Sequence, residues 1–110
     1  MADYYYERET RTPHSESYLI DDEEGQHIGR VDIHYVPSGP VHATLCVGEG
    51  MTEEDLEDLI GDVDERLVMT ADPFREDFVV SVWRGRSAGV YSEESLDLEE
   101  DLDDGQNGHR

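Results

Sequence analysis

The chain has 110 residues, of which 35% are apolar, so it accommodates a single domain with a modest hydrophobic core. Its formal charge is −21 at pH 7, and all eight of its basic side chains are arginines. So few cations on so acidic a chain argue against direct binding of DNA or RNA, because the phosphates would be repelled. The sequence also has no apolar run long enough to span a membrane, and its single cysteine, Cys46, excludes an intramolecular disulfide.

The charge is spread unevenly and divides the chain into three predicted parts. Residues 1–16 carry four acids and two arginines, a charge of −2, and are predicted to form an N-terminal arm. Residues 17–91 carry 17 acids and five arginines, a charge of −12, and contain the periodic apolar runs of an α+β domain. Residues 92–110 carry eight acids and one arginine, a charge of −7, and are predicted to be a disordered acidic tail.

The acidity of the central part has two interpretations. A protein adapted to high salt carries an acidic surface whose self-repulsion is screened by abundant ions, and the complete absence of lysine fits a GC-rich genome. Alternatively, the acidity serves to bind a basic partner or to mimic a nucleic acid. The first residues, MADYYYERET, lack the apolar segment of a signal peptide, so a cytoplasmic location is expected by default.

The first half of the chain reads as a series of strands. Three tyrosines at 4–6 favour a strand, but Pro13 ends any regular run, so the arm is predicted either to be loose or to add to a sheet edge. Three strands separated by the turn segments DDEEGQ and PSGP are then predicted at 17–20, 27–36 and 41–47.

The clearest predicted element is a helix over about residues 52–68. Thr52 is a good N-cap, and Asp55 follows it at the spacing of a capping box. One face of this helix is apolar, while the remaining face is almost wholly acidic. The apolar stripe consists of Leu56, Leu59, Ile60, Val63 and Leu67.

The segment FVVSVW, at 78–83, predicts a strand after the helix, and a short further strand is allowed at 89–91. The predicted fold class is therefore α+β, as a single domain with the order β-β-β-α-β. Its sheet is mainly antiparallel, and the amphipathic helix covers one face.

The face of the sheet away from the helix carries the candidate metal ligands. If the odd-numbered residues of 27–36 and 41–47 form the core, one register places His34 opposite His42, with Asp32 one pleat away. Two histidines and a carboxylate at that distance can bind zinc or another divalent metal. The alternative is a pair of ordinary exposed strand histidines.

The same outer face is more apolar than a solvated face requires, because alternation places Val36, Val79 and Trp83 on it. It is predicted to be a partner interface, most simply that of a homodimer packed sheet to sheet; the alternative is that the tyrosine-rich arm covers it. In the tail, leucines among carboxylates are typical of disordered segments that fold onto a partner. These leucines are Leu96, Leu98 and Leu102.

No motif in the sequence supports catalysis or a cofactor, so the protein is not expected to be an enzyme. The leading hypothesis is a non-enzymatic acidic interaction module that binds itself or a protein with a basic surface. The alternatives are a small metal-binding protein that uses His34, His42 and Asp32, and an acidic mimic of nucleic acid.

Overall fold

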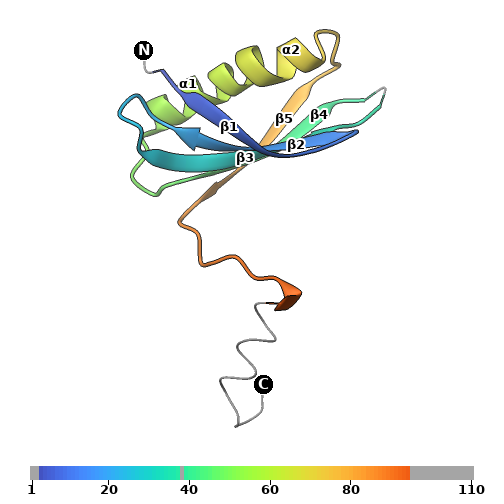
Figure 1. Ribbon diagram of the computed structural model, residues 1–110. Coiled ribbons are helices and arrows are strands. Elements are labelled where there is room, and N and C mark those ends of the chain that lie inside the picture. The colour runs from blue at the N-terminus through green and yellow to red at the C-terminus, as the bar shows by residue number, and fades with distance from the viewer. Residues whose placement is uncertain (1–2, 38, 95–110) are drawn as a thin grey trace.

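Five strands form one sheet, and a single helical segment crosses one of its faces (Figure 1). This computed structural model describes residues 3–37 and 39–94, so Leu96, Leu98 and Leu102 lie outside the described residues. The strands are β1 (Tyr5–Thr12), β2 (Ser15–Asp21), β3 (His27–Tyr35), β4 (Val41–Val47) and β5 (Phe78–Arg84). The helical segment consists of α1 (Glu53–Val63), the π-helical turn η1 (Asp64–Val68) and α2 (Met69–Ala71). None of the described helices is long and apolar enough to cross a membrane.

The predicted α+β class is confirmed, but four strands rather than three precede the helix. The strands lie in the sheet in the order β1-β2-β3-β4-β5, so each of the first four is antiparallel to its neighbour in sequence. β5 instead runs parallel to β4, because the chain returns over one face through the helix before it enters the sheet again. The strand allowed by the sequence at 89–91 does not form.

The additional strand comes from the N-terminal arm, for which the sequence left two alternatives. Residues Tyr5–Thr12 add to the edge of the sheet beside β2, and Pro13 lies in the tight turn between the two strands. The register shifts between Arg8 and Thr10, which leaves Glu9 without a cross-strand partner. The strand also contains no apolar residue after Tyr6, so the alternation that identifies a strand in sequence is absent from most of it.

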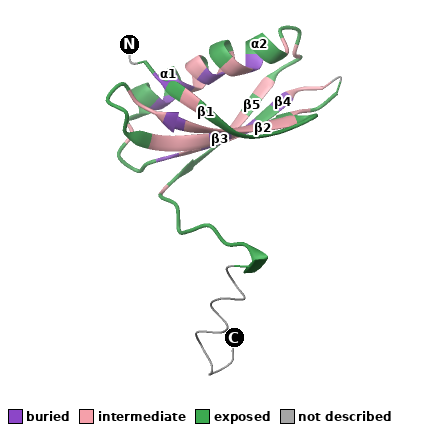
Figure 2. Ribbon diagram, in the orientation of Figure 1, coloured by how far each residue is buried: buried purple, intermediate pink, exposed green. Residues whose placement is uncertain are grey.

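The hydrophobic core lies between the helical segment and the sheet, where the buried residues of both layers meet (Figure 2). In β4 every odd-numbered residue is buried, as the alternation predicts. The core residues are Tyr4, Ile20, Val31, Ile33, Val41, Ala43, Leu45, Val47, Leu56, Leu59, Val63 and Val68.

The helix begins as predicted, but its buried stripe ends differently. The Thr52 hydroxyl accepts a hydrogen bond of 3.1 Å from the backbone N–H of Asp55, which confirms the N-cap. Near the other end, Val68 is fully buried and Leu67 only partly, whereas α-helical spacing predicts the reverse. The cause is η1, in which the N–H of Met69 bonds to the carbonyl of Asp64, because a π turn places Val63 and Val68 on the same face.

Polar contacts fasten the helix to the β1 side of the sheet. The Tyr6 hydroxyl donates to Asp62 at 2.5 Å, and Arg66 donates to the backbone carbonyl of Tyr4 at 2.7 Å. At the other edge, Val82 belongs to the helix-facing set of β5 yet keeps 37% of its surface exposed. The helix therefore covers β5 less completely than it covers the middle of the sheet.

Tyr35 carries the one buried side-chain polar atom without a hydrogen-bond partner among the described residues. Burial is the main cause that raises the pKa of its hydroxyl to about 12, and the charge of Glu16 adds to it. Because an unsatisfied buried hydroxyl is costly, we expect Tyr35→Phe to leave the free energy of unfolding unchanged or to raise it by about 1 kcal/mol. Urea denaturation followed by circular dichroism measures this change.

The same substitution has a predictable pH dependence. A tyrosine titrates near pH 10 in the unfolded chain, so the wild type loses stability as the pH rises from about 10 through the folded pKa of Tyr35. Tyr35→Phe should therefore lose less stability than the wild type over this alkaline pH range, because it lacks the hydroxyl that titrates. Tyr6→Phe is the matched control, because it deletes a hydroxyl that does donate a hydrogen bond, and it should cost about 1 kcal/mol. Equal losses in both variants at neutral pH would contradict this account.

Candidate interaction surface

The outer face of the sheet has the register that the alternation predicts. His34 of β3 pairs directly with His42 of β4, and Asp32 pairs with Thr44 in the neighbouring row. Three rows of side chains cross this face from β2 to β5. They are Ser15–His34–His42–Val79, Ser17–Asp32–Thr44–Ser81 and Leu19–Arg30–Cys46–Trp83.

The predicted metal ligands are only partly brought together. The two histidines oppose each other, but Asp32 accepts hydrogen bonds from Ser17 at 2.7 Å and from Arg30 at 3.2 Å. Among residues 3–37 and 39–94, no group of three or more histidine, cysteine, aspartate and glutamate side chains could hold a metal ion. The metal-binding interpretation stays a prediction, and the geometry adds nothing to it.

Within the three rows of the outer face, the exposed apolar side chains lie on β5. Val79 and Trp83 flank Ser81 on that strand and are 42% and 66% exposed. Val36 is also exposed, but it lies just beyond the end of β3. Trp83 is level with Arg30 of β3, and Val36 follows Arg30 by six positions. That separation is about 20 Å along the strand direction, so Val36 does not form one patch with Trp83.

The tyrosine-rich arm does not cover this face. Its strand lies at the β1 edge, four strands away from β5, and Tyr4 and Tyr6 pack against the core under the helix. The alternative prediction, that the arm shields the outer face, is therefore wrong. Of the three tyrosines of the arm, only Tyr5 lies on the outer side of the sheet, and it is 55% exposed.

The outer edge of β5 is open. The N–H of Val41 donates to the carbonyl of Asp77 at 2.8 Å, and the N–H of Gly85 donates to the carbonyl of Val47 at 2.9 Å. Odd-numbered residues of this strand therefore direct their backbone groups toward β4, and even-numbered residues direct theirs away from the sheet. No described segment pairs with those outward groups, since β5 is the last strand of the order.

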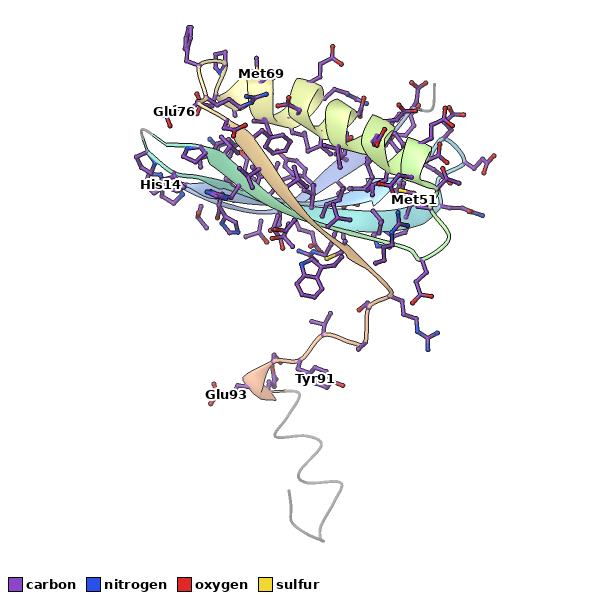
Figure 3. The ribbon with its side chains drawn as sticks, turned by 180° about the vertical axis from the view of Figure 1, so that it is seen from behind. His14, Met51, Met69, Glu76, Tyr91 and Glu93 are labelled. Atoms are coloured by element: carbon purple, nitrogen blue, oxygen red, sulfur yellow. The ribbon has the colours of Figure 1, made fainter. Side chains whose placement is uncertain are left out.

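The two edges of the sheet differ in their protection. β1 carries charged side chains and the irregularity at Glu9, both of which discourage pairing with another strand. The segment 78–83 of β5 has no charged residue, proline or break in register. Beyond it the chain leads away, and Tyr91 and Glu93 lie far from the sheet (Figure 3). β5 is thus an unprotected apolar edge.

A second feature lies where α1 begins, close to Met51 (Figure 3). An open cavity of about 520 Å³ has an apolar floor and an acidic rim. Burial, and after it the negative charges of Asp55 and Asp58, raise the pKa of the Tyr4 hydroxyl on this floor. Such surroundings fit a basic side chain with an apolar stem. The floor is formed by Tyr4, Ile28 and Met51, and the acids of the rim are Asp22, Glu23, Glu24 and Asp55. His27, Gly48 and Gly50 complete the lining.

Comparisons of the chain with protein-family models, with curated proteins and with solved structures give no match.

Proposed function

We propose that the protein is a non-enzymatic interaction module that binds another protein chain through β5. The observation that carries this proposal is the combination of an open strand edge with an exposed tryptophan on the same strand. Extended segments commonly bind by adding a strand to such an edge, where backbone hydrogen bonds supply affinity. Aromatic side chains beside the edge are frequent anchors of protein interfaces.

The charge of the surface supports a partner that presents basic side chains. The helix exposes carboxylates along its length, and the cavity at its start has an acidic rim over an apolar floor. Within the described residues, most arginines are already paired with acids of the same chain, among them Arg30 with Glu9 and Arg75 with Asp64. Positive charge for the cavity is therefore better supplied from outside.

The proposal is tested by placing a photoreactive benzophenone side chain at position 83 of the full chain in the native host. Irradiation should join this position covalently to a protein. The matched control carries the same group at Thr10, which lies on the outer side of β1, at the far edge of the sheet, and is also exposed.

A protein adduct at position 83 but not at position 10 supports the proposal, whether the joined protein is a second copy or a different chain. The absence of any protein adduct at position 83, or equal labelling at both positions, contradicts it.

A further inference from the structure

We infer that the chain that occupies the β5 edge is a second copy of the protein, paired antiparallel about a twofold axis at Ser81. This inference rests on the proposed function and specifies its partner. It would join two five-stranded sheets into one continuous sheet across two β5 strands. A twofold contact of this kind is isologous, so each strand must be complementary to itself when reversed.

The backbone of β5 meets that requirement. Val80 and Val82 both direct their N–H and C=O groups outward. This follows because the odd-numbered Asp77 and Gly85 form backbone hydrogen bonds with β4, and backbone groups alternate in direction along a strand. With Ser81 on the axis, Val80 of one copy opposes Val82 of the other. Each such pair can exchange two hydrogen bonds, as antiparallel strands require.

The side chains are complementary in the same register. Val79 of one copy opposes Trp83 of the other in a position without backbone hydrogen bonds, where opposing side chains approach most closely. This contact occurs twice because of the symmetry. Both side chains are exposed in the single chain, so the pairing removes apolar surface from water without opening the core.

The charges at the two ends of the strand also match. The strand is preceded by Glu76 and Asp77, and its last residue, Arg84, is followed by Gly85 and Arg86. In this register Arg84 opposes Phe78, and the same spacing, continued past the strand ends, sets Arg86 opposite Glu76 of the second copy. A shift of the axis to Val80 would place Trp83 opposite Asp77, and a shift to Val82 would place it opposite Ser81. Of these three registers, only the one centred on Ser81 places the exposed Trp83 opposite an apolar side chain, that of Val79.

Edge pairing also suits the charge of the whole chain better than stacking of two outer faces. Stacking would bury rows that are largely polar, including Asp32, His34 and His42. It would also bring two chains of charge −21 into contact over a broad area. Contact along one strand leaves most of the acidic surface exposed to solvent and counter-ions.

The pairing is tested with Ser81→Cys in a Cys46→Ser background. Residues that oppose each other on the axis have Cα atoms about 4.5 Å apart, which is within the range that a disulfide accepts. Under mild oxidation in molar sodium chloride, which screens repulsion between the chains, we expect nearly complete conversion to a covalent dimer. The control is Thr44→Cys in the same background, one strand inward on the same face.

Rapid cross-linking at position 81 but not at position 44 supports the inference. Cross-linking at position 44 overturns it in favour of stacked faces. A wild type that sediments as a monomer, with no dimer from either cysteine variant, overturns it outright. If the photoreactive group at position 83 then captures a different protein, the interaction module stands while the self-pairing fails.

A charge exchange tests the register without a new covalent bond. Glu76→Arg or Arg86→Glu alone places like charges opposite each other at two symmetric positions, and both side chains are exposed in the single chain. Each should weaken dimerisation roughly fivefold in sedimentation equilibrium at moderate salt, because exposed ion pairs contribute modestly. The double variant should recover the wild-type dissociation constant, and a further loss in the double variant contradicts this register.

Discussion

Replacing Gly29 by alanine is expected to lower the free energy of unfolding by about 3 kcal/mol, because the added methyl group has no space. A Cβ atom at this position would lie 2.3 Å from the carbonyl oxygen of Cys46. That oxygen belongs to β4 in the middle of the sheet, where Gly29 pairs with Val47 on one side and with Ile20 on the other. Neither strand can move away without loss of its hydrogen bonds to the next one.

Urea denaturation followed by far-ultraviolet circular dichroism measures the change. Gly48→Ala is the matched control, since a Cβ atom there would meet nothing within 4 Å, and it should leave the midpoint nearly unchanged. A midpoint of Gly29→Ala equal to that of the wild type would show that β3 and β4 can separate at this position, against the close approach described here.

Leu59→Ala is expected to cost about 3 kcal/mol, within the range typical of a leucine truncated in a closed core. The Leu59 side chain is fully buried between α1 and the sheet, in the middle of the helix. The loss combines the apolar surface no longer buried with the cavity that remains. A small domain is stable by only about 5–15 kcal/mol, so a substantial share of its stability would disappear.

Glu57→Ala serves as the control on the same helix, because Glu57 is exposed and is surrounded by other acids. It should change the free energy of unfolding by less than about 0.5 kcal/mol, the usual range for surface substitutions. If both variants unfold at the same urea concentration, Leu59 is not a core residue and the packing of α1 on the sheet is wrong.

The elements predicted well from sequence are those whose signals are local. β4 was predicted with its bounds, because strict alternation between two turn segments identifies a half-buried strand. The start of α1 follows from Thr52 and its spacing to Asp55. Odd-to-odd alignment of β3 with β4 also follows, since both strands bury their odd-numbered residues. The pairing of His34 with His42 is one of the registers that this alignment allows, and it is the one that forms.

The features that were missed depend on structure far along the chain or on irregular geometry. For β1 the sequence left open whether the arm is loose or adds to a sheet edge, because residues 7–12 contain no apolar residue whose alternation would identify a strand. Val68 escapes because a helical period of 3.6 residues excludes it from the stripe, whereas the π turn of η1 includes it.

The candidate surface was predictable only in part. Alternation along FVVSVW places Val79 and Trp83 on the outer side, and the register with β4 agrees. The sequence of β5 does not indicate which strand it pairs with. Its place at the edge of the sheet and its parallel direction follow only from its pairing with β4. The open edge therefore becomes visible only with the fold.

The position of β5 has a consequence for the order in which the sheet forms and opens. The first four strands are joined by short turns, whereas Phe78 reaches its partner Val41 from 37 positions further along the chain. Such a long loop costs more entropy to close, so β5 should join the sheet last and, with a single neighbour, exchange its amide hydrogens first. A chain bound to its outer edge would hold this strand in place. Association would then be linked to local folding, and the strand least secured by its own chain would gain the most from a partner.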